Sequence, residues 1–302
     1  MNAARTLPAD AVALRIGFIG AGRLGQALAW SLNKAGLKVV AVSSTLQEHA
    51  STLAQPIEGC QCMSPQALVE DCDLIFITTP DRVIGPTCES LSFQSGQAVV
   101  HCSGVTEIDV LDHARAQGAS IGGFHPMQTF GDPLAAVQSL PGCTITVEAQ
   151  AELMSVLLQL VERLGCRANR LPAGMRGRYH AAAGYTSQFI NALFDQAIRI
   201  WQTWGATEDE AMRALLPLAH GTLRSIQSAG VARGMPGPVS RGDLSSVDKH
   251  MRALSPMGEE ALAFYRNLCT ATVAVALQAQ GIDALRAQKF MDLLQAPGEH
   301  VC

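Results

Sequence analysis

The stretch GAGRLG at residues 20–25 decides how the chain begins to fold. It follows an apolar run at residues 14–19 and leads into an amphipathic run at residues 24–35. The first run is typical of a buried strand and the second of a helix with one apolar face. The order of strand, glycine loop and helix predicts a nucleotide-binding unit at the start of the chain.

Each glycine of this loop has a separate expected task. Gly20 permits a tight turn, Gly22 lets the backbone approach a pyrophosphate, and Gly25 lets helix and strand pack closely. The helix N-terminus adds free N–H groups and the positive end of its dipole, both of which favour an anion. The loop therefore predicts a dinucleotide site. The alternative is a glycine turn in a Rossmann-like domain that binds no nucleotide.

Composition excludes several classes of protein. The 302 residues are 48% hydrophobic and 16% charged, and the net charge of −4 does not favour a nucleic-acid partner. No apolar run reaches the ~18–20 residues of a membrane span. The nine cysteines include no CxxC pair or metal-ligand spacing, so we expect reduced thiols, a cytoplasmic protein and no metal.

The pattern along the chain predicts two domains. Apolar strands alternate with helices in the first half, which indicates a doubly wound α/β sheet, parallel and covered on both faces. Beyond residue 149 the strand signal stops and helices dominate, so we place a Rossmann domain at 1–166 and an all-α domain at 167–302. The expected strands are 14–19, 38–43, 74–78, 98–102, 120–124 and 143–147, and the later helices 152–164, 178–204, 208–227, 244–254, 258–279 and 284–294.

The end of the second expected strand indicates which dinucleotide fits. An acidic residue there selects NAD by binding the ribose hydroxyls, but this chain carries Ser43, Ser44 and Thr45. Hydroxyl and N–H groups accept a 2′-phosphate that a carboxylate would repel, and Arg23 can add a cation. We therefore expect NADP, with NAD as the alternative. The same three residues could also cap the helix that follows.

Polar residues that follow later strands are candidates for the chemistry. Ligands of a doubly wound sheet bind at the carboxyl ends of its strands. Thr79 and Pro80 suit a loop beneath a cofactor ribose, or else a simple turn after the strand. Ser103 is expected near the nicotinamide, or else as a helix cap. His125, held on a rigid His-Pro turn, is expected as an acid or orienting donor, or else as a structural histidine bonded to backbone.

The second half contributes a polar stripe and one cation. His180, Gly184, Ser187 and Asn191 are spaced 4-3-4 and would share one face of an Ala-rich helix. Such a stripe lines a cleft or forms buried structural hydrogen bonds. Arg241 follows a Pro-Gly-Pro turn and is a candidate clamp for an anion.

Four stretches together resemble a known bacterial family. They are GFIGAGRLGQALA at 17–29, GGFHPMQTF at 122–130, RYHAAAGYTSQFINAL at 178–193 and PGPVSRGDLSSVDKHMRAL at 236–254. The family joins a Rossmann-like NADP-binding domain to a helical domain of unknown function. It belongs to the 6-phosphogluconate dehydrogenase-like superfamily, alongside pyrroline-5-carboxylate reductase and β-hydroxyacid dehydrogenases. The resemblance spans nearly the whole chain.

The resemblance implies an NADP-dependent reductase of a small carbonyl or imine compound with a carboxylate, a ketopantoate-like 2-oxo acid first of all. It also implies a homodimer through the helical domain. Arg176 stands where the family commonly has Lys, and Gln188 where it often has Asn, so His125 and His180 become the expected proton handlers. The alternative is an NADP-binding sensor without catalysis. The expected cofactor site is Gly20, Gly22, Arg23, Leu24, Gly25, Ser43, Ser44, Thr45, Thr79 and Pro80; the catalytic set is His125, His180 and Ser103; and the substrate-binding set is Arg176, Ser187, Gln188 and Arg241.

Overall fold

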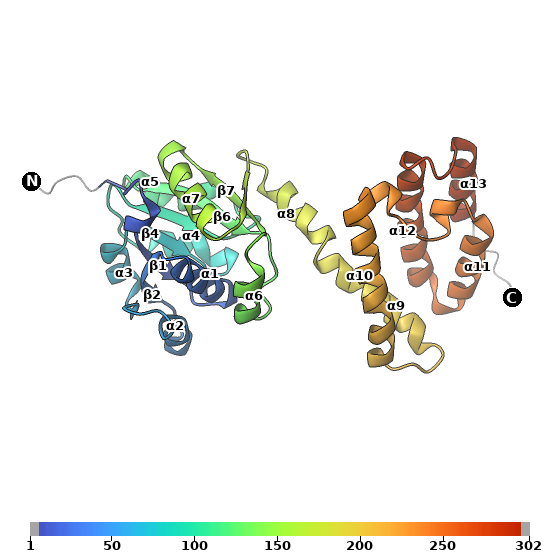
Figure 1. The fold of residues 1–302 in the computed structure, drawn as a ribbon, viewed down its shortest axis with the longest axis horizontal. Coiled ribbons are helices and arrows are strands. Elements are labelled where there is room, and N and C mark those ends of the chain that lie inside the picture. Colours follow the sequence, from blue (N-terminus) through green and yellow to red (C-terminus); the bar gives the residue numbers. More distant parts are fainter. Residues whose placement is uncertain (1–5, 297–302) are drawn as a thin grey trace, which may run out of the picture. The chain divides into compact units, whose positions relative to one another are not determined.

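The structure, a computed structural model, describes residues 6–296 and divides into two compact units (Figure 1). The first unit ends at Gln188 and the second begins at Phe189. No helix in this described range is long and apolar enough to cross a membrane. The cysteines among these residues are all free thiols.

The first unit is built on one sheet with the strand order β3-β2-β1-β4-β5-β6-β7-β8. Neighbouring strands are parallel except β6 and β7, which are antiparallel. The predicted Rossmann-like sheet is thus confirmed, with a reversal at its far end. The strands are β1 (Arg15–Ile19), β2 (Lys38–Ser43), β3 (Gln61–Cys62), β4 (Leu74–Ile77), β5 (Ala98–His101), β6 (Ser120–Pro126), β7 (Thr144–Ala149) and β8 (Arg167–Arg170).

Helices cover both faces of this sheet, as the apolar strands predict. Side chains of α1 and α7 pack on one face, and those of α3, α4 and α5 pack on the other. One short helix, η1, precedes β1, and another, η2, directly precedes α5. The helices of this unit are η1 (Ala11–Ala13), α1 (Arg23–Lys34), α2 (Gln47–Ala54), α3 (Pro65–Asp71), α4 (Asp81–Glu89), η2 (Ile108–Leu111), α5 (Asp112–Ala116), α6 (Pro133–Ser139), α7 (Ala151–Arg163) and α8 (Arg176–Tyr185).

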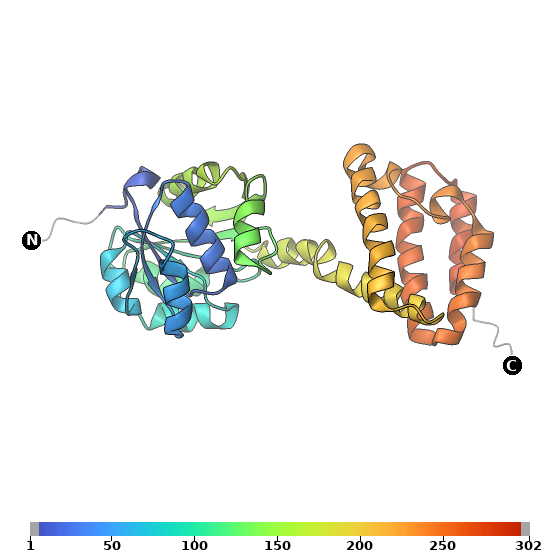
Figure 2. The same ribbon diagram turned by 60° about the horizontal axis from the view of Figure 1, so that its bottom comes forward.

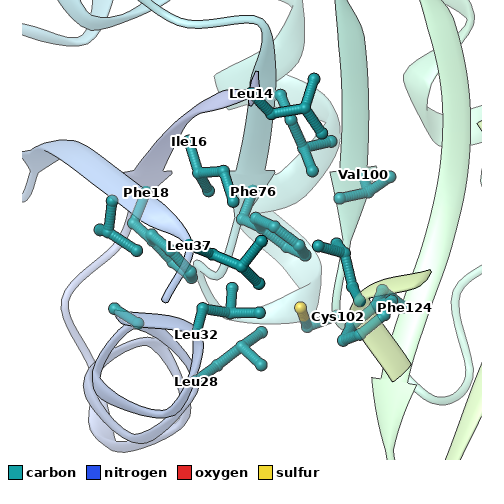
Figure 3. Packing of buried hydrophobic residues seen from close by; sticks show 14 of the residues in the cluster. Leu14, Ile16, Phe18, Leu28, Leu32, Leu37, Phe76, Val100, Cys102 and Phe124 are labelled. Carbon is teal, nitrogen blue, oxygen red and sulfur yellow. The ribbon is translucent and has the colours of Figure 1, made fainter. Parts of the chain in front are cut away.

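The core beneath α1 is centred on three aromatic rings from three strands. Phe18 stacks on Phe76 with 5.0 Å between ring centroids, and Phe76 meets Phe124 edge to face at 5.6 Å. Leu28 and Leu32 of α1 close over the same cluster (Figure 3). This packing fixes α1 against the sheet, and therefore fixes the glycine loop from which α1 begins.

The first unit is longer than the expected domain of residues 1–166. β8 pairs with β7 in parallel, and α8 also belongs to this unit. The sequence of β8, RANR, is polar and mostly exposed because the strand lies at the sheet edge. Such a strand carries no apolar alternation, so the sequence pattern gives no signal for it.

The described part of the second unit contains helices and loops but no strand, as expected. α12 packs against α10, α11 and α13, and Figure 2 shows these helices in orange and red. Their starts agree with the four expected helices from residue 208 onward, but α10 continues to Arg233 whereas its expected end is residue 227. The elements are α9 (Gln188–Gln202), α10 (Glu208–Arg233), η3 (Val239–Arg241), α11 (Leu244–Leu254), η4 (Ser255–Met257), α12 (Glu259–Gln278) and α13 (Ala284–Gln295).

One predicted helix, residues 178–204, is wrong as a single element. α8 ends at Tyr185, with Thr186 as its C-cap, and α9 starts at Gln188. The polar stripe is therefore divided: His180 and Gly184 belong to α8, whereas Asn191 lies in α9 of the second unit. Continuous helical periodicity conceals a short break of this kind.

Candidate functional site

The three glycines of the loop have the backbone geometry and surroundings that their expected tasks require. Gly20 has a φ of +111°, and a Cβ there would lie 2.7 Å from the backbone carbon of Thr78. A Cβ on Gly25 would lie 2.5 Å from the carbonyl oxygen of Gly20. Nothing lies within 4 Å of a Cβ on Gly22, which faces open space. The Thr78 hydroxyl donates to the Gly20 carbonyl at 2.6 Å and secures the loop against β4.

A cavity of about 800 Å³ opens above this loop at the carboxyl ends of β1, β2, β4 and β5. Every expected cofactor residue lines it except Gly25, which packs beneath the loop. Sequence reasoning missed His49 on α2 and Thr87 and Ser90 on or beside α4. No local signal identifies them, because their position depends on how these helices return to the sheet. The lining is Ile19, Gly20, Ala21, Gly22, Arg23, Leu24, Ser43, Ser44, Thr45, His49, Pro65, Thr78, Thr79, Pro80, Asp81, Val83, Thr87, Ser90, Cys102 and Ser103.

The cavity offers unpaired polar groups to a nucleotide. The hydroxyl of Thr79 is buried, and among the described residues it has no hydrogen-bond partner. Gly22 is the N-cap of α1 and supplies no side-chain cap, so the first N–H groups of α1 point to the loop without one. A buried hydroxyl without a partner is costly unless a ligand or water satisfies it. The residues present therefore fit a dinucleotide.

In the structure, the serine run does not cap the helix that follows it, α2. The N-cap of α2 is Leu46, which makes no side-chain cap. Ser44 accepts only a long hydrogen bond from the Leu46 N–H, at 3.4 Å, and all three residues of the run, Ser43 to Thr45, line the cavity. Arg23 also lines it and reaches the carbonyl of Gly131 at 3.4 Å.

Beside the cavity, α8 lies over two rungs of paired residues that face the same side of the sheet. In the first rung, His101, Gly123 and Glu148 stand opposite one another on β5, β6 and β7. Arg176 of α8 enters here, and a Cβ on Gly123 would overlap its guanidinium group. The side chain of Arg176 is fully buried. Its Nε donates to Glu148 at 2.7 Å and its Nη1 donates to the Ser103 carbonyl at 2.7 Å.

The second rung holds a polar chain that the sequence analysis missed. His125, Thr146 and Asn169 stand opposite one another on β6, β7 and β8. Tyr179, three residues beyond Arg176 on α8, places its hydroxyl 2.7 Å from His125 Nδ1. Tyr179 is also hydrogen-bonded to Thr146, whose hydroxyl oxygen accepts from Asn169 at 3.0 Å. The register of the strands, which sequence alone did not provide, brings these residues together.

The two expected proton handlers lie close to each other over Gly104. The ring centroids of His125 and His180 are 6.2 Å apart. A Cβ on Gly104 would lie 2.5 Å from His180 Cδ2 and 2.9 Å from His125 Nε2. Gly104 directly follows Ser103, which lines the nucleotide cavity. The two imidazoles therefore lie beside the end of the cavity that contains Ser103.

Burial and nearby positive charge keep the deeper imidazoles neutral. Burial, then His180, then Arg176 lower the pKa of His125 to about 4. Burial and Arg176 lower the pKa of His101 to about 3. Burial raises the pKa of Tyr179, so its hydroxyl keeps its proton. At neutral pH His125 is therefore a neutral hydrogen-bonding group and not a charged acid.

Ser103 has a different local role from the one expected. Its hydroxyl oxygen accepts from the N–H groups of Val105 and Thr106 and is 2.9 Å from the Thr106 hydroxyl. These bonds form a turn within the loop after β5 and do not cap a helix, because the next helix, η2, has Glu107 as its N-cap. Its catalytic role stays a prediction.

Arg176 is also placed differently from the expectation. A substrate carboxylate would need an accessible cation, but this guanidinium is buried and already paired with Glu148. Glu107, another residue missed from sequence, accepts from the backbone N–H groups of Gly174 and Arg176 at 3.2 Å each and fixes the start of α8. Arg176 therefore acts within the domain, and the expected direct contact with substrate is corrected.

The remaining candidates for substrate binding lie at the end of α8 or beyond it. The Ser187 hydroxyl donates to the Ala183 carbonyl at 2.8 Å, and Gln188 begins α9. Arg241 ends η3 in the second unit with an exposed side chain. Their roles toward substrate stay predictions. Among the described residues, no group of His, Cys, Asp and Glu could hold a metal ion.

Two family models match the chain. Residues 15–104 match a family described as NADP oxidoreductase, coenzyme F420-dependent. Residues 143–272 match DUF2520, a domain of unknown function. The chain pairs an NADP oxidoreductase domain with a DUF2520 domain. This confirms the predicted two-domain Rossmann-like family and its NADP-type cofactor domain. None of the curated proteins matches the chain.

Solved structures share this two-domain fold. Protein TM1727 from Thermotoga maritima has a TM-score of 0.72 and 22% identity, with 88% of this chain and 99% of that chain covered. A reductive aminase from Aspergillus terreus in complex with NADPH4, cyclohexanone and allyl amine has a TM-score of 0.61 and 16% identity, with 92% and 99% covered. Pyrroline carboxylate reductase from Plasmodium falciparum with NADP bound has a TM-score of 0.58 and 13% identity, with 88% and 99% covered. At these identities the likeness concerns the fold.

The boundaries of the DUF2520 match clarify the site. The match begins at Cys143, just before β7, and so includes Glu148, Asn169 and both α8 residues that touch the sheet, Arg176 and Tyr179. His125 lies between the two matched regions. The region that matches the NADP oxidoreductase family thus lines the cavity, and the region that matches DUF2520 contains Thr146, Tyr179 and His180 beside His125.

Proposed function

We propose that this protein is an NADP-dependent reductase of a small carbonyl or imine compound. The observation that carries the proposal is the Tyr179–His125 pair, 2.7 Å apart, beside a cavity built for a dinucleotide. A reduction needs a hydride and a donor that polarises or protonates the substrate oxygen or nitrogen. NADPH supplies the hydride when it is bound.

The cavity supports the choice of NADP. Ser43, Ser44 and Thr45 line it where an acidic residue would select NAD, and Arg23 adds a cation. Within residues 6–296 the Thr79 hydroxyl has no hydrogen-bond partner, so it suits a ribose or phosphate oxygen. The glycine loop brings the first N–H groups of α1 to the pyrophosphate.

His125 is the proposed donor to substrate. It is neutral at neutral pH, so it acts through an N–H group and not through a positive charge. Its ring and that of His180 border Gly104, and the lack of a side chain on this glycine makes room for both rings. His180 lies beside His125, and we propose that it helps to position and protonate the substrate.

We infer the substrate class from the donor groups of His125 and His180 and from the structural neighbours. An N–H donor can form a hydrogen bond to a carbonyl oxygen or to an imine nitrogen and polarise either bond. Neighbours of the same fold include a reductive aminase in complex with NADPH, an imine reductase in complex with NADPH4 and a pyrroline carboxylate reductase with NADP bound. We propose a ketopantoate-like 2-oxo acid as the first compound to test and cyclic imines as the second. Arg241 remains the proposed partner for a substrate carboxylate.

A binding and turnover assay tests this proposal. NADPH is expected to raise the melting temperature more than NADH at equal concentration, because the serine run accepts a 2′-phosphate. Loss of NADPH absorbance is expected with at least one 2-oxo acid or cyclic imine. Tight NADPH binding without turnover of either class would favour the sensor instead. No effect of either nucleotide on melting would contradict the whole proposal.

We also propose a homodimer formed through the second unit. α9 and α10 expose several large apolar side chains, among them Leu193, Leu218 and Leu223 at 42%, 66% and 56%. Exposed apolar surface on one group of helices is typical of an interface between subunits. Light scattering during gel filtration is expected to give twice the 32.0 kDa chain mass. A mass equal to one chain would contradict the dimer.

A further inference from the structure

The polar chain behind His125 has a defined direction of hydrogen bonding. The Asn169 Nδ2 group can only donate, and it donates to the Thr146 hydroxyl oxygen at 3.0 Å. Thr146 is fully buried, so its own single proton needs an acceptor, and its other hydrogen-bond partner among the described residues is Tyr179. The Thr146 proton therefore points at Tyr179.

The proton count then determines the last bond of the chain. The Tyr179 oxygen already accepts from Thr146, and its own single proton is free to donate. Burial keeps that hydroxyl protonated. The Tyr179 oxygen lies 2.7 Å from His125 Nδ1, so the tyrosine donates and Nδ1 accepts. A neutral imidazole that accepts at Nδ1 carries its proton at Nε2.

The position of Nε2 determines which group His125 presents toward the cavity. Nε2 lies on the side of the ring next to Gly104, 2.9 Å from where a Cβ would stand. Gly104 borders Ser103 and hence the nucleotide cavity. The proton of His125 thus points toward the edge at which substrate is proposed to bind, and the other tautomer would present only a lone pair there.

The surroundings hold this chain in place. Thr146 is fully buried, and the strand register sets His125, Thr146 and Asn169 side by side. Tyr179 is held on α8, whose neighbouring turn is anchored by the Arg176–Glu148 pair. Other groups that face His125 are His180 and the Arg176 charge, and both oppose a second proton on the ring.

We propose that Asn169, Thr146 and Tyr179 form a positioning relay that holds His125 as its Nε2–H tautomer, so that it presents a hydrogen-bond donor to the substrate. The three residues act through His125 and touch no substrate themselves. The statement about the tautomer concerns the free protein. Its use in reduction rests on the proposed function.

Nitrogen NMR of the histidine side chains tests the tautomer directly. The ¹⁵N shifts of an imidazole distinguish a protonated from an unprotonated ring nitrogen, and a His125→Gln variant identifies the signals of His125. The wild-type protein at neutral pH, without nucleotide, is expected to show Nε2 protonated and Nδ1 unprotonated. A protonated Nδ1 would overturn the proposal.

Three variants then test the relay. Tyr179→Phe removes the donor to Nδ1, and Thr146→Val removes the inner hydroxyl at nearly constant volume. Both are expected to give a mixture of tautomers, whereas Thr146→Ser is expected to restore the wild-type signals. If Tyr179→Phe leaves a pure Nε2–H tautomer, the relay does not set it and the proposal fails.

A matched control separates this effect from the general loss of a tyrosine hydroxyl. In the second unit, Tyr265 is bonded to His250 Nδ1 at 2.8 Å in a similar pair. Tyr265→Phe is expected to leave the His125 signals unchanged. If it shifts them as Tyr179→Phe does, the specific role of Tyr179 is contradicted.

Kinetics distinguish failure of the relay from failure of the proposed function. With an active substrate, Tyr179→Phe and Thr146→Val are expected to lower kcat by about 10-fold or more with little change in the KM for NADPH. A wild-type protein that shows the Nε2–H tautomer but no turnover would contradict the function alone. Turnover that is unchanged in variants with mixed tautomers would contradict the proposed use of the relay.

Discussion

Arg176 shows how the fold gives a residue a role different from the one its sequence position indicates. On a helix near polar residues, an arginine is a reasonable anion ligand. In the structure Gly123 makes room for it, Glu148 neutralises it and the Ser103 carbonyl accepts from it. The sequence indicated that this residue matters but could not reveal its partner, because the pairing depends on strand register.

Removal of one partner from this buried pair is expected to destabilise the protein strongly. Glu148→Gln leaves the Arg176 charge buried without compensation, which costs roughly 3–5 kcal/mol of unfolding free energy. Urea unfolding measures the loss. The control is Asp195→Asn, because the Asp195–Arg199 pair is exposed and contributes little. An equal effect of the two substitutions would contradict the buried-pair account.

The neutral state of His125 predicts a pH dependence of stability. Its pKa is about 4 in the folded protein and about 6.5 when unfolded, so between these values the unfolded chain binds more protons. Stability is therefore full above about pH 6.5 and falls as the pH drops toward about 4, by up to about 3 kcal/mol from this group.

The variant His125→Gln isolates this contribution. Its unfolding free energy is expected to depend less on pH than that of the wild type across the same range, because the buried titrating group is gone. Chemical unfolding at a series of pH values measures both slopes. Parallel slopes would show that His125 titrates normally and is not kept neutral by its surroundings.

At the scale of elements, the glycine loop was predictable and the far end of the sheet was not. The spacing of residues 20–25 and the apolar strands give direct local signals, and each glycine has its expected geometry. β8 is polar because it is an edge strand, and the break between α8 and α9 leaves helical periodicity intact. Asn169 lies on β8 and Tyr179 lies on α8, and neither element was predicted with its place in the first unit. The relay was therefore not visible in the sequence.

The glycine loop allows a prediction about how α1 serves the cavity. Gly25→Ala would press a Cβ against the Gly20 carbonyl, so we expect both weaker NADPH binding and lower stability. Gly22→Ala meets no protein atom within 4 Å, so only NADPH binding should weaken, by roughly tenfold or more. Calorimetric titration and thermal unfolding separate the two. Unchanged affinity in Gly22→Ala would show that nucleotide does not approach this loop.

At the scale of the whole molecule, the sequence predicted an α/β unit followed by a helical unit, and the structure has both. The expected boundary at residue 166 differs from the structural one at Gln188, because β8 and α8 complete the first unit. The cavity is lined by residues between 19 and 103, in the region that matches the NADP oxidoreductase family, whereas several residues around His125 lie in the DUF2520 region, so the candidate site draws on both matched regions.

Transfer of a labelled hydride tests the central claim most directly. NADPH carrying deuterium at the transferred position is incubated with the protein and a set of 2-oxo acids and cyclic imines, and products are analysed by mass spectrometry. We expect one product of reduction to carry one deuterium on the reduced carbon, and His125→Gln to lower its yield by about 100-fold. Tight binding of the labelled NADPH with no deuterium in any product would contradict a reductase.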